Sequence, residues 1–144
     1  MTSFVLDTDH LSLLQQSHPA VIRHLSAIPA AEIAITIVTA EEQLRGWLAV
    51  IRQHHASTRQ LWAYRSLREA LASFTRFTIL DFDQAAYDHY TALRQSHPRL
   101  GTQDLRIAAI TSSIGATLVT RNHRDFSQLP HLTLADWTIS AASP

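Results

Sequence analysis

The stretch FVLDTD, residues 4–9, shows the unit from which the chain is built. Its apolar half predicts a short buried strand that closes at Asp7, and a helical pattern begins at Asp9, with Leu11 and Leu14 on one face. In open parallel sheets, functional side chains gather at the carboxyl ends of the strands. Asp7 stands at such an end, so we expect it to belong to a site.

The same alternation of strand and helix continues along the chain. Further strands are predicted at residues 32–38, 77–80, 116–120 and 132–134, and further helices at residues 39–55, 57–74, 84–95 and 102–113. Gly115 is placed to end the last of these helices, and a short helix or turn is expected at residues 121–128. Strands separated by helices predict an α/β fold, with a mostly parallel sheet of about five strands covered on both faces. The two longest helices would form a hairpin that protrudes from the sheet.

The size and composition of the chain are those of one globular domain. With 144 residues, 46% hydrophobic and 17% charged, we expect a single domain over residues 1–139 and a loose tail at residues 140–144. No apolar run approaches the roughly 20 residues of a membrane span, and the N-terminus lacks a signal-peptide pattern. A cytoplasmic protein is therefore expected.

The charged residues exclude several kinds of function. The formal net charge is zero, all 12 basic residues are arginine, and cysteine is absent. Zero net charge argues against gripping nucleic acid through a uniform basic field, although arginine can still clamp individual phosphates. The lack of lysine excludes haloacid-dehalogenase-type phosphatases, which an Asp7-x-Asp9 motif would otherwise suggest, and receiver domains. The lack of cysteine excludes disulfides and thiolate chemistry.

Four acidic residues fall at predicted junctions between strands and helices. Asp7 and Asp125 follow apolar strands, whereas Glu42 and Asp104 lie in helical patterns near their start. A parallel sheet would bring them to one edge, where like charges raise one another's pKa unless a divalent cation neutralises them. Oxygen ligands without cysteine favour Mg²⁺ or Mn²⁺ over Zn²⁺. The pattern predicts a metal site of the kind that handles phosphate esters.

Each acid also has a purely structural interpretation. Asp7 would cap the helix that follows it, and Glu42 would complete a capping box with the threonine three positions before it. Asp104 would be favoured by the helix dipole, and Asp125 would be a solvated turn residue. Asp9 is a fifth acid, expected to cap the first helix or to contact the metal ligands without binding the metal itself. With the acids serving only as caps, the chain would be a non-catalytic binding module.

Five blocks of sequence carry a resemblance to a known family. They are LDTD, VTAEEQLRG, GTQDLRIAA, LVTRNHRDF and ADW, in this order between Phe4 and Trp137. Through their order and spacing, the chain resembles PIN-domain ribonucleases of the VapC toxin type. The resemblance implies a three-layer α/β/α sandwich and an endoribonuclease that depends on Mg²⁺ or Mn²⁺.

The resemblance also implies roles for single residues. The positions of the family's catalytic acids are taken by Asp7, Glu42, Asp104 and Asp125. Asp7 and Asp104 would be the principal metal ligands. A T-x-N segment that supports the site is matched by Thr120 and Asn122.

Two positions depart from the family's pattern, and one is ambiguous. Asp9 stands where relatives often carry asparagine, and Arg121 stands where a small or polar residue is common. Glu41 directly precedes Glu42. Glu42 is chosen because its distance to Gly46 matches the family's E-x-x-x-G, and one helical step would turn Glu41 by about 100°.

The reaction and the partners follow from the same resemblance. A water oriented by Glu42 or Asp125 would attack the phosphodiester in line and leave a 5′-phosphate and a 3′-hydroxyl. The substrate would be RNA, with tRNA favoured, and a small VapB-like antitoxin would cover the acids. Toxins of this type usually form homodimers. The alternative within the family is a PIN nuclease that processes RNA without an antitoxin.

Histidine and tryptophan residues give weaker signals. The nine histidines show no zinc-like pairing, so His10 is given no role and His123 is expected at the surface. The tryptophans could stack on RNA bases. We expect them instead in the core or at an interface: Trp47, Trp62 and Trp137.

Overall fold

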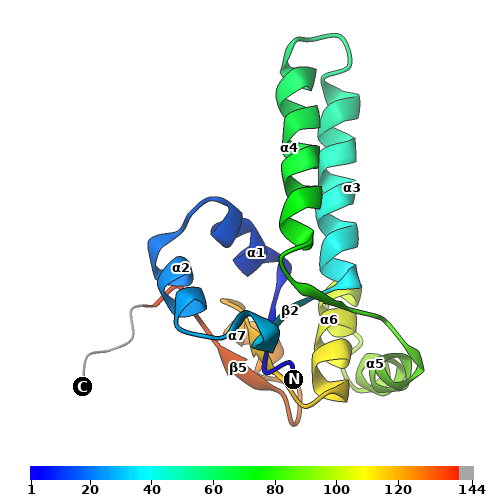
Figure 1. Cartoon of the computed structure of the whole chain (residues 1–144). Helices are drawn as coiled ribbons and strands as arrows, with labels where there is room; N and C mark the ends of the chain where they lie inside the picture. The colour runs from blue at the N-terminus through cyan, green and yellow to red at the C-terminus, as the bar shows by residue number, and fades with distance from the viewer. Residues whose placement is uncertain (140–144) are drawn as a thin grey trace.

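A computed structural model describes residues 1–139 of the chain, and the tail expected at residues 140–144 lies outside the described residues. The strands are β1 (Phe4–Leu6), β2 (Ile33–Thr36), β3 (Thr78–Leu80), β4 (Thr117–Val119) and β5 (Thr133–Ala135). The α-helices are α1 (Thr8–Gln15), α2 (Pro19–Ser26), α3 (Ile37–Gln53), α4 (Arg59–Phe74), α5 (Gln84–Ser96), α6 (Thr102–Ser113) and α7 (His123–Phe126). A 3₁₀ turn at Ala30–Glu32 leads into β2. Figure 1 shows their arrangement.

The strands form a single five-stranded sheet in the order β3-β2-β1-β4-β5. Every neighbouring pair is parallel, so the predicted parallel sheet is confirmed. In the central strand, Phe4 lies opposite Ile33 on one side and Thr117 on the other. This register brings the carboxyl ends of β1 and β4 together, where Asp7 and Thr120 follow.

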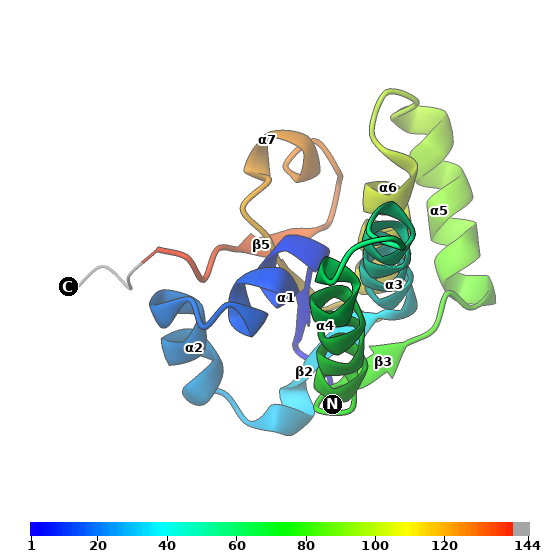
Figure 2. The same ribbon diagram turned by 90° about the horizontal axis from the view of Figure 1, so that it is seen from above.

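Side chains of the strands alternate between two apolar layers. Val5 and Leu118 pack with residues of α5, α6 and α7 in one core cluster. Leu6 and Val119 pack with residues of α1, α2 and α4 in the other. Figure 2 shows α1 and α2 on one side of the sheet and α5 and α6 on the other. The expected three-layer α/β/α sandwich is confirmed.

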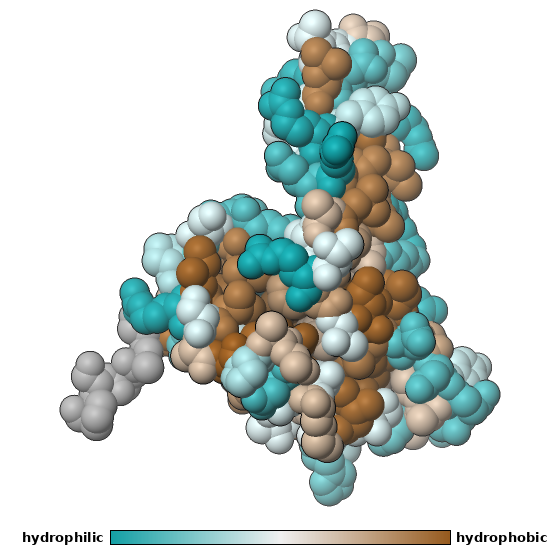
Figure 3. All heavy atoms as spheres, viewed as in Figure 1, coloured by the Kyte–Doolittle hydropathy of each residue, from teal (hydrophilic) through white to brown (hydrophobic). Residues whose placement is uncertain are grey.

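The helices α3 and α4 form the predicted hairpin, which stands out from the rest of the molecule (Figure 1). At about 1.5 Å per residue, helices of 17 and 16 residues extend roughly 25 Å. The rings of Trp47 and Trp62 meet edge to face between them, with centroids 5.5 Å apart. Leu48 and Leu61 of the hairpin are exposed. Figure 3 shows hydrophobic surface along the hairpin. None of the helices that residues 1–139 form has the length and apolar character of a membrane span.

The junction between β2 and α3 differs from the prediction. The strand ends at Thr36 instead of residue 38, and the helix begins at Ile37 instead of residue 39. The cause is Thr36, whose hydroxyl caps the helix by accepting a hydrogen bond from the backbone N–H of Thr39 at 3.1 Å. A capping box that starts at Thr39 is therefore wrong, because Thr39 already lies inside the first turn.

Other local signals agree with the structure. Pro19 opens α2, and Gly115 follows α6 with a left-handed φ of 68°, a conformation that glycine adopts without steric cost. The predicted helix 102–113 matches α6, whereas the last predicted strand is shifted by one residue, to β5 at Thr133–Ala135. Short-range patterns thus located the elements, and errors were confined to their ends.

Candidate active site

Asp7 lies between the end of β1 and the start of α1 and is only 7% exposed. Its backbone N–H donates to the carbonyl of Val119 at 3.1 Å, which ties the end of β1 to β4. Its Oδ1 accepts from the backbone N–H of His10 at 2.7 Å, so Asp7 does cap α1. Oδ2 receives no hydrogen bond from residues 1–139. Capping therefore leaves one carboxylate oxygen available to a cation.

Asp104 lies in the first turn of α6, and the charges of the other three predicted acids all act on it. Burial raises the pKa of Asp104, and the negative charges of Glu42, Asp125 and Asp7 raise it further. Those three carboxylates come from α3, from α7 and from the end of β1. The fold therefore places Glu42, Asp125 and Asp7 near enough to Asp104 for their charges to act on it.

The carboxylate of Glu42 is held by a row of threonine hydroxyls. Thr8 donates to Glu42 Oε1 at 2.7 Å, and the Thr8 hydroxyl lies 3.1 Å from that of Thr39. Thr36 donates in turn to Thr39 at 3.4 Å. Each hydroxyl can donate once toward Glu42, so the row fixes this carboxylate from behind. Thr8 and Thr39 were not predicted to take part.

Glu41 points to different partners. It accepts hydrogen bonds from the amide of Gln103, at 2.9 Å, and from the guanidinium of Arg45. The hydrogen bond from Gln103 and the charge of Arg45 lower the pKa of Glu41 below its ordinary value. Its slight burial raises the pKa, but by less. Glu42, and not Glu41, is among the charges that act on Asp104. This difference supports the choice of Glu42.

Asp125 is held by the T-x-N segment between β4 and α7. The side-chain amide of Asn122 donates to Asp125 Oδ2 at 3.1 Å, and Asn122 Oδ1 accepts from the backbone N–H of Asp125 at 3.3 Å. Thr120, which is fully buried, accepts from the backbone N–H of Asn122 at 3.0 Å. Asn122 thus holds Asp125 directly, and Thr120 acts through the backbone of Asn122.

Asp9 does not cap α1, so that alternative is wrong: Asp7 occupies the cap and Asp9 lies in the first turn. Both Asp9 oxygens accept hydrogen bonds from the guanidinium of Arg121. Among residues 1–139, Asp7, Asp9 and His10 form a group whose ligand atoms lie within 4.8 Å of one another. Arg121 holds both oxygens of Asp9, and His10 contacts Asp7 Oδ1, so protein partners already engage these members of the group.

His10 is the main residue that the sequence analysis missed. It is fully buried, and its Nδ1 lies 3.2 Å from Asp7 Oδ1. The available signal was its position three residues after Asp7, in the first helical turn and next to the buried Leu11. His123 is exposed, as predicted, and Trp137 is in the core at 3% exposure.

The donor set of this site fits a hard divalent cation. Its acids offer carboxylate oxygens only. Burial raises the pKa of Asp104, and the charges of Glu42, Asp125 and Asp7 raise it further, so a cation beside Asp104 would relieve this repulsion. Neither Asp7 Oδ2 nor the Asp104 carboxyl accepts a hydrogen bond within the described part of the chain. Such a cluster can bind a cation and bring a phosphate ester against it.

A comparison with known families decides the affiliation. The model of the family described as PIN domain matches residues 4–132. The chain belongs to the PIN-domain family. Family membership was predicted from the sequence and is confirmed.

Relatives of this PIN domain include named proteins of similar length. It is 27% identical over 141 residues to the tRNA(fMet)-specific endonuclease VapC of Salmonella typhimurium, covering 95% of this chain and 99% of the relative. It is 26% identical over 142 residues to Ribonuclease VapC1 of Haemophilus influenzae, covering 94% of this chain and 98% of that protein.

Solved structures agree with these sequence relationships. DNA-bound VapBC from Salmonella typhimurium superposes with a TM-score of 0.78 and 26% identity, covering 95% of this chain and 99% of the other. VapBC2 from Rickettsia felis, bound to a DNA fragment from its promoter, gives a TM-score of 0.76 and 25% identity over 94% of this chain and 99% of the other. The PIN domain described here is therefore similar to VapC proteins in both sequence and fold.

Proposed function

We propose that this PIN domain is a toxin endoribonuclease that hydrolyses phosphodiester bonds in RNA with Mg²⁺ or Mn²⁺. The observation that carries the proposal is that three other acids, from separate elements, gather around Asp104. The charges of Glu42, Asp125 and Asp7 all raise the pKa of its carboxyl. The relatives named as ribonuclease or endonuclease, which match nearly the full length of the chain, support it.

In this proposal Asp7 and Asp104 hold the cation, Asp7 through its free Oδ2. When bound, the cation would polarise the phosphate and stabilise the charge that develops on it. Glu42 has one oxygen fixed by Thr8, which leaves Oε2 to orient a water and accept its proton. Asp125, held by Asn122, would orient the same water or the phosphate from the other side.

The proposed substrate is tRNA. The support is the Salmonella relative, which is named a tRNA(fMet)-specific endonuclease and matches 95% of this chain. With zero net charge, the protein would contact RNA through individual arginines and the bound cation instead of a broad basic surface.

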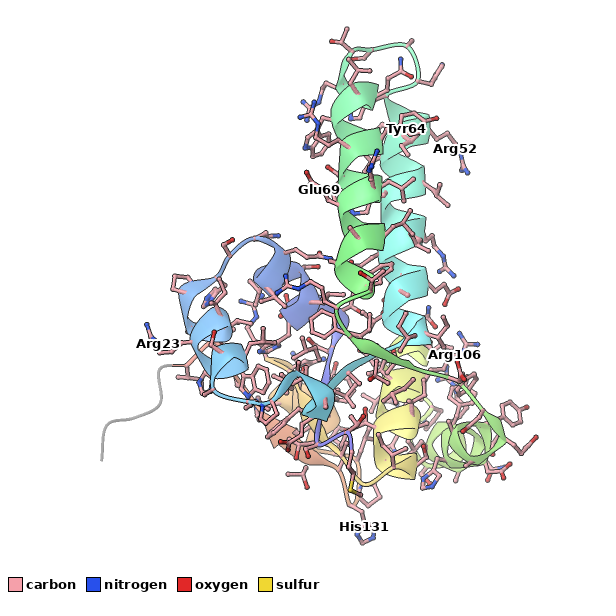
Figure 4. The ribbon with its side chains drawn as sticks, viewed as in Figure 1. Arg23, Arg52, Tyr64, Glu69, Arg106 and His131 are labelled. Carbon is pink, nitrogen blue, oxygen red and sulfur yellow. The ribbon has the colours of Figure 1, made fainter. Side chains whose placement is uncertain are left out.

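The proposed partner is a VapB-like antitoxin, because the structural neighbours are VapBC complexes. A groove of about 820 Å³ runs between α1 and the hairpin, and its walls include Thr8, Glu42, Trp47 and Trp62. Glu69 also lines it and points from α4 to the side where α1 and α2 lie, whereas Arg52 points away (Figure 4). An amphipathic helix in this groove would end beside Glu42 and block the acids.

A homodimer is part of the same proposal. A second hollow, of about 530 Å³, lies on the other face of α3 and is lined mostly by apolar side chains. Ile37 and Leu48 in this hollow are 42% and 52% exposed. A second copy of the chain would cover them.

The proposal is tested by incubating the purified chain with total RNA in Mg²⁺ and sequencing the new 5′ ends. We expect cuts at defined positions in tRNA, loss of cutting in EDTA, and recovery with added Mn²⁺. Asp104→Asn is the inactive control. Cutting that persists unchanged in EDTA would overturn the metal site, and no cutting of any RNA would favour the binding module.

A further inference from the structure

His10 connects the first acid of the site to the C-terminal segment. Its exposure is 0%, Nδ1 lies 3.2 Å from Asp7 Oδ1, and Nε2 lies 3.2 Å from the backbone nitrogen of Trp137. Trp137 follows β5 and lies outside residues 4–132, to which the family model extends. A contact across 127 positions therefore joins the site to a part of the chain beyond the matched domain.

The partners of the imidazole fix which nitrogen carries its proton. The backbone N–H of Trp137 can only donate, so Nε2 must accept. A neutral ring then carries its hydrogen on Nδ1, which faces the carboxylate of Asp7 and donates to Oδ1. Both ring nitrogens are satisfied in this single tautomer.

The neighbouring acid Asp136 does not change this assignment. Its Oδ1 lies 3.6 Å from Nε2, which is beyond hydrogen-bond distance. The same oxygen accepts from the backbone N–H and the hydroxyl of Thr138, at 2.8 and 2.5 Å. Asp136 is thus bonded to Thr138, and the backbone N–H of Trp137 is the donor to Nε2.

The consequence for Asp7 concerns its two oxygens. Oδ1 receives two hydrogen bonds from the same residue, one from the backbone N–H of His10 and one from its ring. Two donors on one oxygen fix the rotation of the carboxylate, and Oδ2 then faces away from them. We infer that His10 is a positioning residue that, together with the Trp137 backbone, holds Asp7 so that Oδ2 is presented to the divalent cation. This inference rests on the proposed function, in which Asp7 is a metal ligand.

The competing interpretation is that His10 only fills the core. Trp137 packs against Phe4 and stacks on His24, with ring centroids at 5.4 and 5.8 Å, so the region is also an apolar cluster. A packing role would make the fold sensitive to His10 but would not distinguish its two nitrogens. The two roles separate when each hydrogen bond is removed alone.

Two substitutions remove the hydrogen bonds one at a time. His10→Asn places an amide N–H near the position of Nδ1 and keeps the donor to Asp7, but it cannot reach Trp137. His10→Gln places an amide oxygen near the position of Nε2 and keeps the acceptor for Trp137, but it loses the donor to Asp7. His24→Asn is the matched control, because the His24 ring stacks on the Trp137 ring, whereas the histidine at Asp7 Oδ1 is His10.

The measurement is the dissociation constant for Mn²⁺ alone, by calorimetric titration of the full chain, with melting temperatures recorded in parallel. We expect His10→Gln to weaken Mn²⁺ binding by roughly 10–100-fold, as losses of groups behind a metal ligand do. His10→Asn should recover most of the affinity while melting lower, and His24→Asn should bind like the wild type. Equal weakening in both His10 variants, or none in His10→Gln, would overturn the inference.

A measurement on the unchanged protein covers the case in which the variants fail to fold. A long-range ¹H–¹⁵N NMR spectrum should show His10 protonated on Nδ1, and the Nδ1 signal should move when Mg²⁺ is added. A proton on Nε2 would remove the donor to Asp7 and overturn the positioning role. Wild-type protein that binds neither Mn²⁺ nor Mg²⁺ would instead refute the proposed function, so the two failures are distinguishable.

Discussion

Arg121 and Asp9 stand 112 positions apart and meet in a two-pronged ion pair: Nε and Nη2 of the guanidinium donate to the two carboxylate oxygens, each at 2.7 Å. These are the two positions at which the sequence departs from the family's pattern. The pair joins the first turn of α1 to the loop between β4 and α7. The ion pair balances the charge of Asp9. It also keeps the Arg121 guanidinium near Asp7 and Asp136, whose charges act on it too.

From this position we predict that Arg121 contacts an RNA phosphate. Its side chain is 51% exposed, so it can bind substrate while remaining paired with Asp9. Arg121→Gln should raise KM for RNA roughly tenfold, the effect of losing about 1.4 kcal/mol of binding, with little change in kcat. Its free energy of unfolding should change by less than about 1 kcal/mol, as for an exposed ion pair. The measurement is steady-state kinetics, with Arg124→Gln as a neighbouring control. A wild-type KM in both variants would contradict the prediction.

The two adjacent glutamates should separate by activity. Glu42→Gln should lower kcat by at least about 100-fold, because it removes the group that accepts a proton from the attacking water. Glu41→Gln should stay near wild type, because Glu41 is exposed and engaged with Arg45 and Gln103. Single-turnover cleavage of one tRNA substrate measures both, and the reverse order would show that Glu41 is the catalytic member.

Asp104 should destabilise the metal-free protein at neutral pH. Folding raises its pKa above the ordinary value of 3.8, so the folded state binds a proton more readily than the unfolded chain. Stability therefore falls as pH rises from that value through the raised pKa, and the loss is complete above it. Without metal at pH 7, Asp104→Asn should melt higher than wild type.

The pH and metal dependence provide the controls for this prediction. The difference between Asp104→Asn and wild type should disappear below about pH 3.8, where both states hold the proton. Added Mg²⁺ should raise the melting temperature of the wild type and leave Asp104→Asn nearly unchanged. Glu41→Gln should not melt higher, because its carboxyl has a lowered pKa. Thermal melts in which Asp104→Asn is less stable than wild type at pH 7 would mean that its charge is already compensated.

Expression of the chain alone should arrest growth, and a small protein encoded beside its gene should restore growth. The acids around Asp104 offer such an inhibitor a place for an arginine or lysine, and replacing that cation should weaken the complex by about 2–5 kcal/mol. Expression of Asp104→Asn is the control and should be harmless. Harmless expression of enzyme that cleaves RNA in vitro, with no binding protein encoded nearby, would favour an RNA-processing nuclease.

Local sequence determined the elements and the identity of the acids. An apolar triplet such as Phe4-Val5-Leu6 has to be buried, and the polar residues after it have to end the strand, whatever the rest of the chain does. Asp7 and Asn122 act as helix caps through residues at most three positions away, so their local roles were within reach of the sequence. Thr36 was missed as a cap for a local reason: three β-branched residues follow it, and they extend the strand pattern into what is the first turn of a helix.

Only the tertiary structure decided how the acids are held. The contacts of Thr8 with Glu42, of Asp9 with Arg121 and of His10 with Trp137 span 34, 112 and 127 positions. Each depends on the register of β1 between β2 and β4, which sets which loops meet above the sheet. The hydrophobic periods of strands and helices, 2 and 3.6 residues, show which face of its element a side chain lies on. They do not show which distant residue the side chain contacts. The sequence alone therefore located the acids, while the packing of the sheet determined the partners that hold them.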